Sequence, residues 1–266
     1  MEKSDIYILR ADPLDPSLKK IKTSKKKELD KGFQDTIDAF KKEVILEGIS
    51  ITSGIVNGKV LIVKSPNDLE KITENTNILV LSDEVYEHII FDHKIHQGVC
   101  RYPKLKKKSL IISSFGKTFH TTGWKMGYVL APQELMAEFR KIHQFIVFGV
   151  NTPIQYAVAE FMKDPENYIH LPNFYQQKRD YFCNILKNSR FNIAPSKGTY
   201  FQLLDYSRIS DEKEEDFAVR LTKEFKVASI PVSVFYHKKT ENTVLRFCFA
   251  KSEETMNKAA EILCKI

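Results

Sequence analysis

The chain lacks the sequence features of secreted, membrane-spanning and nucleotide-binding proteins. Its 266 residues include only four cysteines, without C-x-x-C spacing, so we expect a reduced cytoplasmic protein rather than a disulfide scaffold. No segment approaches the roughly eighteen apolar residues of a membrane span. The first residues, MEKSDIYILRADPLD, lack the apolar core of a signal peptide. Neither Gly-x-x-x-x-Gly-Lys-Ser/Thr nor Gly-x-Gly-x-x-Gly occurs, which argues against two common phosphate-binding loops.

The charge is unbalanced toward lysine. The net charge is +7, and the lysines concentrate in SKKKELDK (24–31) and KLKKKS (104–109). Such runs can indicate nucleic-acid binding. No aromatic interleaving and no nucleic-acid-binding motif accompanies them here. We therefore interpret both runs as solvated lysine clusters and expect no nucleic-acid partner.

The middle of the chain has the pattern of an α/β sheet. NILVLSD (77–83) and SLIISSF (109–115) are apolar runs that end in polar residues, as strands buried on both faces of a parallel sheet do. GYVLAP (127–132) indicates a third such strand. Helical patterns follow over 132–148, with proline in its first turn, and over 152–164. Because functional residues gather at the carboxyl ends of such strands, the polar residues there are the first candidates for a site.

The two ends of the chain have sequence patterns that differ from that of the middle. Residues 1–43 are lysine-rich, with a predicted amphipathic helix over 27–43, and 44–65 read as short strands and turns before a helix that opens within 65–72. Beyond a boundary near 160–172, helices and strands alternate in an α+β pattern. The predicted elements there are helices over 173–189, 214–226 and 252–266 and strands over 198–207, 227–234 and 243–250.

Four polar side chains follow the apolar strands. Asp83 and Tyr86 come after the first strand, and Ser114 and Lys117 after the second. In an open α/β sheet these strand ends face one crevice, where an acid, a phenol, a hydroxyl and an amine would meet. A lysine there can clamp a phosphate, act as a general base or form a Schiff base. Taken singly, each residue also has an ordinary interpretation: Asp83 caps a helix, Tyr86 packs, and Lys117 is solvated.

Together these residues resemble a known family. Asp-Glu-Val-Tyr (83–86) follows one strand, and Ser-Phe-Gly-Lys-Thr-Phe-(x)₃-Gly-Trp-Lys-x-Gly (114–127) follows the next. The pattern resembles the class I/II aminotransferases, pyridoxal-phosphate enzymes of fold type I. The resemblance runs from about residue 75 to the C-terminus. The segments that fit it in order are NTPIQ, PSKGTYF, IPVSVF and LRFCFAKS. Within the family, the sequence looks most like the branch acting on methionine, kynurenine and aromatic amino acids.

The resemblance implies an α/β fold in two parts. These are an incomplete pyridoxal-phosphate-dependent transferase large domain, with a mostly parallel sheet and helices, and a C-terminal α+β small domain. The implied division is a lysine-rich segment at 1–43, a strand and turn segment at 44–74, a partial large domain at 75–164 and a small domain at 165–266.

The resemblance also implies residue roles toward pyridoxal 5′-phosphate. Lys117 would bind the cofactor covalently and then act as the acid and base that moves the substrate's proton. Asp83 would keep the ring nitrogen protonated, and Tyr86 would hydrogen-bond the ring's phenolic oxygen. Ser114 and Lys125 would bind the cofactor phosphate. Many relatives carry arginine where Lys125 stands, but lysine is a workable point charge there.

Substrate and partners follow from the same resemblance. Arg246, in LRF, would grip the substrate α-carboxylate through a two-pronged pair. Its apolar strand argues against a plain surface arginine, since an unpaired charge is costly there. The implied reactants are an amino acid and a 2-oxo acid. Family members are homodimers, and part of their interface lies in a portion that this sequence does not match, so we expect weak dimerisation with exposed apolar surface.

A metal site is the weaker alternative for the stretch EHIIFDHKIH. His88, Asp92 and His96 fall at i, i+4 and i+8, which would align them on a helix. The stretch follows a strand, and it resembles an excursion rich in β-structure in the family. Helical spacing is then irrelevant, and we expect no metal.

The part before residue 75 does not resemble the aminotransferase family. Residues 44–80 weakly resemble the swivelling phosphohistidine domain of phosphoenolpyruvate-utilising enzymes, without the histidine motif. The chain thus looks like a piece of another domain joined at NILV to the later part of an aminotransferase. Two alternatives to a transaminase remain open: a non-catalytic remnant that acts as an interaction module, and a phosphotransfer swivel domain.

Overall fold

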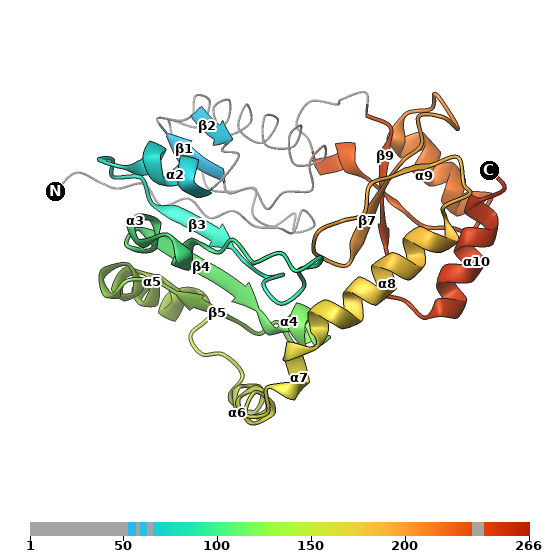
Figure 1. The fold of residues 1–266 in the computed structure, drawn as a ribbon. Helices are drawn as coiled ribbons and strands as arrows, with labels where there is room; N and C mark the ends of the chain where they lie inside the picture. Colours follow the sequence, from blue (N-terminus) through green and yellow to red (C-terminus); the bar gives the residue numbers. More distant parts are fainter. Residues whose placement is uncertain (1–52, 57–58, 63–65, 236–241) are drawn as a thin grey trace. The chain divides into compact units, whose positions relative to one another are not determined.

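The computed structural model describes residues 53–56, 59–62, 66–235 and 242–266, which fall into two compact units (Figure 1). The first unit comprises the described residues up to Val85 together with Gln97–Glu160. The second unit comprises Tyr86–His96 and Phe161–Ile266. The helix predicted over 27–43 lies outside the described residues. The predicted four-part division remains a prediction.

A three-stranded sheet forms the centre of the first unit. Its order is β3 (Val80–Asp83), β4 (Ser109–Ser114) and β5 (Gly127–Leu130). Strands β3 and β4 are parallel, with Asp83 opposite Ile112. Both predicted apolar runs therefore form neighbouring strands, and their carboxyl ends lie at the same edge of the sheet.

Strand β5 departs from the expectation of a third buried parallel strand. It runs antiparallel to β4, with Ser114 opposite Gly127, and its Leu130 is 51% exposed. The connection from β4 contains only the short helices α4 (Phe115–Thr118) and η3 (Thr122–Trp124). A parallel return needs a crossover to the far end of the sheet, usually through a long helix. This connection, which the structure describes throughout, contains no long helix, and β5 returns antiparallel.

The remaining elements of the first unit match the predicted types where a prediction was made. They are the antiparallel hairpin β1 (Ser53–Val56) and β2 (Lys59–Ile62), then α2 (Pro66–Thr73), η2 (Val99–Arg101), α3 (Pro103–Lys106), α5 (Gln133–Ile146) and α6 (Thr152–Phe161). The short helices η2 and α3 were not predicted. The core is small and joins Leu69, Val80, Val99, Leu105 and Ile111. No helix in the described part of the chain has the length and apolar character of a membrane span.

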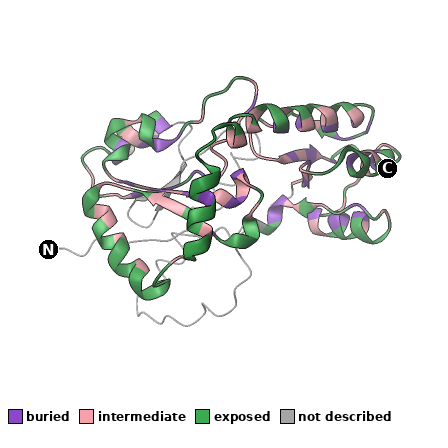
Figure 2. Cartoon of the chain, turned by 90° about the horizontal axis from the view of Figure 1, so that it is seen from below, coloured by how far each residue is buried: buried purple, intermediate pink, exposed green. Residues whose placement is uncertain are grey.

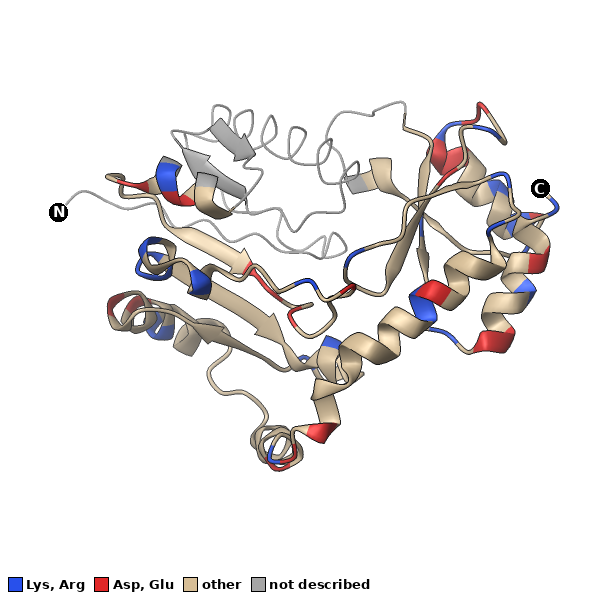
Figure 3. Ribbon diagram, in the orientation of Figure 1, with Lys and Arg blue, Asp and Glu red and all other residues tan. Residues whose placement is uncertain are grey.

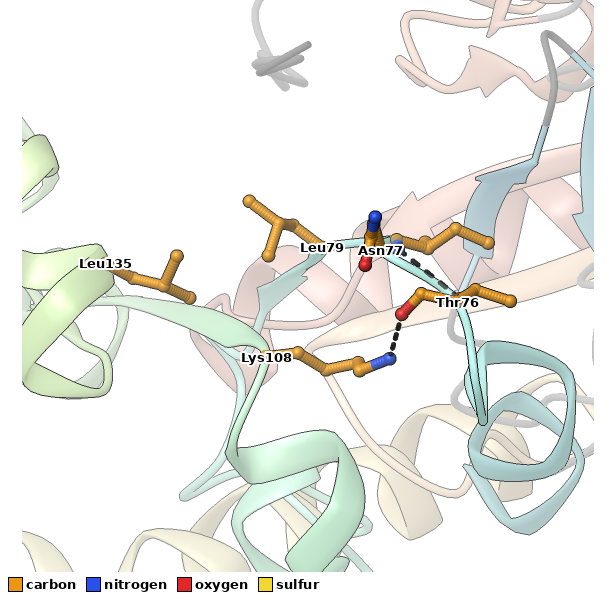
Figure 4. Close-up of a pocket in the computed structure, with 6 residues that line it drawn as sticks. Thr76, Asn77, Leu79, Lys108 and Leu135 are labelled. Carbon is orange, nitrogen blue, oxygen red and sulfur yellow. Dashed lines mark hydrogen bonds between the residues drawn. The ribbon is translucent and has the colours of Figure 1, made fainter. Parts of the chain in front are cut away.

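Part of the lysine cluster at 104–109 is bonded to the end of α2 and to the residues that follow it. Lys104 pairs with Glu74 at 2.6 Å, and Lys108 Nζ donates to the carbonyls of Thr73 and Thr76 at 2.6 and 2.9 Å. Figure 3 shows the basic residues on α3, and Figure 4 shows Lys108 reaching Thr76. A shallow pocket of about 340 Å³ opens here; it is lined by Thr76, Asn77, Ile78, Leu79, Lys108 and Leu135. It lies where β3 begins, at the end of the strand opposite Asp83.

The second unit is an α+β structure around an antiparallel sheet. Its strand order is β6-β7-β9-β8, with β6 at Asn192–Ile193, β7 at Phe201–Asp205, β8 at Ile230–Pro231 and β9 at Val244–Cys248. The helices are α7 (Glu166–Ile169), α8 (Leu171–Ile185), α9 (Glu214–Lys223) and α10 (Glu253–Leu263), and η4 spans Val232–Phe235. The sequence predicted all three long helices and the strands β7, β8 and β9.

The long helices of this unit each bury one side and expose the other (Figure 2). The buried side of α8 contributes Tyr175 and Phe182, and that of α9 contributes Phe217 and Leu221. They pack with alternate residues of β7 and β9, because successive strand residues point to opposite faces. The other face of the sheet carries the more exposed residues of β7 and β9.

Candidate functional site

Lys117 lies in a tight turn at the end of β4. Ser114 is the last residue of that strand and caps α4, where its Oγ accepts the Gly116 N–H at 3.1 Å. The same hydroxyl donates to the Met126 carbonyl at 3.3 Å. Lys117 follows within α4 and is partly buried. The strand end and the cap together direct the chain so that Lys117 lies at the sheet edge.

The turn is closed by a close approach of two backbone segments. Thr122 Oγ1 donates to the Gly116 carbonyl at 3.1 Å. A Cβ atom added to Gly116 would lie 2.8 Å from Thr122 Cα, which is closer than carbon atoms can approach. Only glycine fits here without moving the chain. The turn around Lys117 therefore requires glycine at position 116 and is also held by a hydrogen bond.

Lys125 reaches the same edge from the other side of the turn. It follows η3 with a φ of 54°, in the left-handed region, and is exposed. The next residue, Met126, accepts hydrogen bonds from the Phe115 N–H at 3.2 Å and from the Ser114 hydroxyl. The backbone beside Lys125 is thus bonded directly to the end of β4.

Asp83 ends β3 at this edge. Its carboxylate is exposed and accepts the Val85 N–H at 3.2 Å through Oδ1. The next backbone amide, that of Glu84, donates to the Ile112 carbonyl at 2.8 Å. The first unit therefore brings Asp83, Ser114, Lys117 and Lys125 to one edge of its sheet.

Glu84 has a structural role that the sequence did not reveal. Its carboxylate is buried and accepts the Val99 N–H and the Ser82 hydroxyl, each at 2.9 Å. Its carbonyl accepts the Ser113 hydroxyl at 3.4 Å. Glu84 therefore ties β3 and β4 to the start of η2. In the sequence, Glu84 is simply the acidic residue after Asp83. Its structural role is visible only from its contact with Val99, which is distant in sequence.

Tyr86 and Arg246 belong to the second unit, so Asp83 and Tyr86 fall in different units. The Arg246 guanidinium lies 4.2 Å from the centre of the Phe201 ring, and burial lowers its pKa. The Tyr86 ring meets Tyr200 edge-on at 5.3 Å and Phe201 at 6.5 Å between ring centres. The second unit thus gathers a cation, a phenol and two further rings on neighbouring elements.

The stretch that holds His88, Asp92 and His96 is not a helix. Ile90 forms an isolated β-bridge with Gly198, and Asp92 is paired with Arg179 and Lys197. Within the described residues, no group of three His, Cys, Asp or Glu side chains is placed to hold a metal ion. The helical spacing that suggested a metal face has no counterpart in the backbone.

Comparison with known proteins identifies the family. The family model "Aminotransferase class I and II" matches residues 62–263. A methionine aminotransferase of Escherichia coli is 49% identical over 187 residues, covering 70% of this chain and 48% of the relative. A kynurenine–oxoglutarate transaminase of Dictyostelium discoideum is 32% identical over 231 residues, covering 77% and 53%.

Solved structures agree with this match. The crystal structure of an Escherichia coli protein with a methionine aminotransferase function superposes with a TM-score of 0.73 at 46% identity, covering 76% of this chain and 53% of that one. The chain spans about half the length of the relatives it matches. The predicted fold type I is confirmed. Class I and II aminotransferases use pyridoxal 5′-phosphate. This chain belongs to the class I and II aminotransferase family.

Proposed function

We propose that this chain takes part in pyridoxal-phosphate-dependent transfer of an amino group from an amino acid of the methionine, kynurenine or aromatic type to a 2-oxo acid. The observation that carries the proposal is the position of Lys117 in a turn that requires glycine at 116, with Asp83, Ser114 and Lys125 at the same sheet edge. The two relatives named above support the donor class.

The side chains at this edge fit the cofactor chemically. A carboxylate, Asp83, suits a protonated ring nitrogen, and a hydroxyl and an ammonium group, Ser114 and Lys125, suit a phosphate. Lys117 supplies the primary amine for covalent attachment. The backbones of Gly116 and Thr122 approach so closely that a larger residue at 116 would displace the turn.

When bound, the cofactor supplies an electron sink for the charge that develops on the substrate α-carbon. Lys117 Nζ would take the proton from that α-carbon and deliver it to the cofactor's C4′ carbon, and the reverse movement would return a proton to the α-carbon of the 2-oxo acid in the second half of the transfer. Asp83 would hold a proton on the ring nitrogen. Ser114 and Lys125 would hold the phosphate, which would keep the cofactor oriented toward Lys117.

Arg246 is proposed to bind the α-carboxylate of the substrate. It is partly buried on β9, and the Phe201 ring faces its guanidinium. Burial lowers the pKa of Arg246, so its positive charge is less stable there than in water. A carboxylate ligand would restore that stabilisation through a bidentate pair. The rings of Tyr86 and Tyr200 near Phe201 favour a substrate with an apolar or aromatic side chain.

A second copy of this chain is the proposed protein partner. Residues 142–148 expose an unusual amount of apolar surface, with Phe145 86% and Phe148 89% exposed. Helix α5 has no buried residue in the structure. The family is typically dimeric, and an apolar surface of this kind is covered in oligomers. A cytoplasmic location is proposed from the four cysteines, which are all free thiols.

The test is a transamination assay on the purified chain with pyridoxal phosphate, methionine and a 2-oxo acid. Formation of the amino acid that corresponds to the 2-oxo acid, absent with Lys117→Ala, supports the proposal. Phenylalanine and kynurenine as alternative donors then rank the substrate class. Lack of product in folded, cofactor-bound protein would favour the non-catalytic alternative, which no observation on the described residues otherwise supports. The resemblance of residues 44–80 to a phosphohistidine domain stays a prediction.

A further inference from the structure

The segment Tyr86–His96 is built into the second unit, although the chain on both sides of it belongs to the first. The Phe91 N–H donates to the Lys197 carbonyl at 3.0 Å, and the Thr199 N–H donates to the Ile89 carbonyl at 2.9 Å. Ile89 and Phe91 are each 1% exposed and lie in the core of the second unit. The segment is thus an inserted edge of that unit rather than a surface loop.

An ion pair between the buried Arg179 and the half-buried Asp92 holds the segment Tyr86–His96 against α8. Arg179 donates through Nη1 and Nη2 to the two carboxylate oxygens of Asp92, at 2.9 and 2.7 Å. Lys197 adds a third contact to Asp92 at 3.0 Å. The Arg179 side chain is only 4% exposed, and Nη1 also donates to the Ser196 carbonyl at 2.7 Å. A bidentate guanidinium–carboxylate pair determines orientation as well as distance.

The backbone at this pair is held in an unfavourable conformation. Asp92 and His93 both have a φ of 56°, in the left-handed region that side chains rarely adopt. Such conformations persist only where surrounding contacts determine them. Here the Asp92 N–H donates to Gln176 Oε1 at 2.7 Å, and the Asp92 side chain is held by Arg179. Both contacts come from α8, so this helix imposes the bend.

The start of the segment carries Tyr86. Its ring contacts Tyr200 and Phe201, and Phe201 in turn faces Arg246. We propose that Asp92 and Arg179 are positioning residues, which hold Tyr86–His96 on the second unit and thereby keep the Tyr86 phenol beside Tyr200, Phe201 and Arg246. The consequence for catalysis rests on the proposed function: Tyr86 would be held in the same unit as Arg246, the proposed carboxylate-binding residue.

The first test is hydrogen exchange on the full chain at neutral pH, with Asp92→Asn as the variant. We expect amides within 86–96 to exchange at least tenfold faster, while those of α10 keep the wild-type rate. The matched control is Asp180→Asn, because Asp180 also pairs with Arg179 at 2.7 Å but is 56% exposed and outside the segment. Lys197→Gln, which removes only the more exposed of the two cations, should give a smaller increase confined to the same segment.

Three outcomes would overturn the proposal. The first is unchanged exchange within 86–96 in Asp92→Asn or Lys197→Gln. The second is an equal acceleration of exchange throughout the second unit, and the third is the same effect from Asp180→Asn. If Asp92→Asn does not fold, Lys197→Gln and Asp180→Asn still decide, since the proposal requires that only the first accelerates exchange within 86–96.

The second test reads the position of Tyr86 directly. In protein with isotope-labelled tyrosine rings, the Tyr86 resonances should carry a ring-current shift from Tyr200 and Phe201. Asp92→Asn should move these resonances toward free-tyrosine values, and Asp180→Asn should leave them in place. Tyr86 resonances that keep their wild-type positions in Asp92→Asn would refute the positioning role. Neither measurement needs the cofactor, so if pyridoxal phosphate fails to bind while both results hold, the proposed function fails and the positioning role stands.

Discussion

Arg246 on β9 and Phe201 on β7 form a cation–π pair, with the guanidinium carbon 4.2 Å from the ring centre. The two strands are antiparallel neighbours, in which Phe201 lies opposite Cys248 and Leu203 lies opposite Arg246. Arg246 therefore lies diagonally across from Phe201 on one face of the sheet. A guanidinium over an aromatic ring can still form a bidentate pair with a carboxylate.

Arg246→Ala should abolish the response of the cofactor-loaded protein to amino acids without removing cofactor binding. The lost bidentate pair corresponds to roughly 2–3 kcal/mol of binding free energy, or about a hundredfold in affinity. The measurement is a titration of bound-cofactor absorbance with methionine. Arg208→Ala, at an exposed arginine of the same unit, is the control and should behave as wild type. Retained methionine affinity in Arg246→Ala would show that another group binds the carboxylate.

Gly116→Ala should destabilise the first unit and loosen the turn around Lys117. The added Cβ would lie 2.8 Å from the Thr122 Cα, so the backbone must shift, at a cost of about 1–3 kcal/mol. Urea unfolding measures the change in free energy. Gly123→Ala is the matched control in the same loop, because nothing lies within 4 Å of its added Cβ. Equal effects from the two substitutions would contradict the steric account.

The contribution of Asp92 to stability should be lost in acid. Its hydrogen bonds with Arg179 and then Lys197 hold its pKa well below the value of about 3.9 found in unfolded chains. A lowered folded pKa means that the stabilisation is complete above the unfolded pKa and declines as pH falls below it. Asp92→Asn should therefore cost roughly 3 kcal/mol at pH 7.

The same substitution should cost progressively less below about pH 4, where the wild-type carboxylate begins to lose its advantage. Urea unfolding of wild type and Asp92→Asn at pH 7 and pH 3 gives the difference. The neighbouring Asp180 also pairs with Arg179, so Asp180→Asn is measured in parallel. A penalty for Asp92→Asn that does not change with pH would contradict the charge-based explanation.

The chain should self-associate weakly and in a concentration-dependent way through residues 142–148. Phe145→Ser and Phe148→Ser together should shift sedimentation toward the monomer. Both rings are more than four-fifths exposed in the single chain, so the substitutions remove apolar surface that only an assembly would bury. Lys141→Ser, an exposed change on the same helix, is the control. A compact dimer that stays intact on dilution would contradict the expectation of weak dimerisation.

Local pattern predicted the sheet edge of the first unit but not the contacts that join distant segments. The apolar runs before Asp83 and Ser114 specified two strands, and the parallel pairing of those strands placed both residues at one edge. The direction of β5 depended on a short connection whose length alone does not distinguish turns from a crossover. The assignment of Tyr86 to the second unit depends on Asp92 with Arg179 and Lys197, partners far along the chain. The role of Glu84 was missed for the same reason. Its partner Val99 follows the segment Tyr86–His96, so the contact joins residues that are distant in sequence.

Reductive trapping of the cofactor tests the central claim most directly. Purified chain mixed with pyridoxal phosphate should develop a visible absorbance band, and borohydride should then attach the cofactor irreversibly to one lysine. Peptide mass analysis should find the label on Lys117, with none in Lys117→Ala. Lys117→Arg should also stay unlabelled, because a guanidinium keeps the charge but does not condense with the aldehyde. A label on Lys125 or on any other lysine, or no label in well-folded protein, would contradict the account.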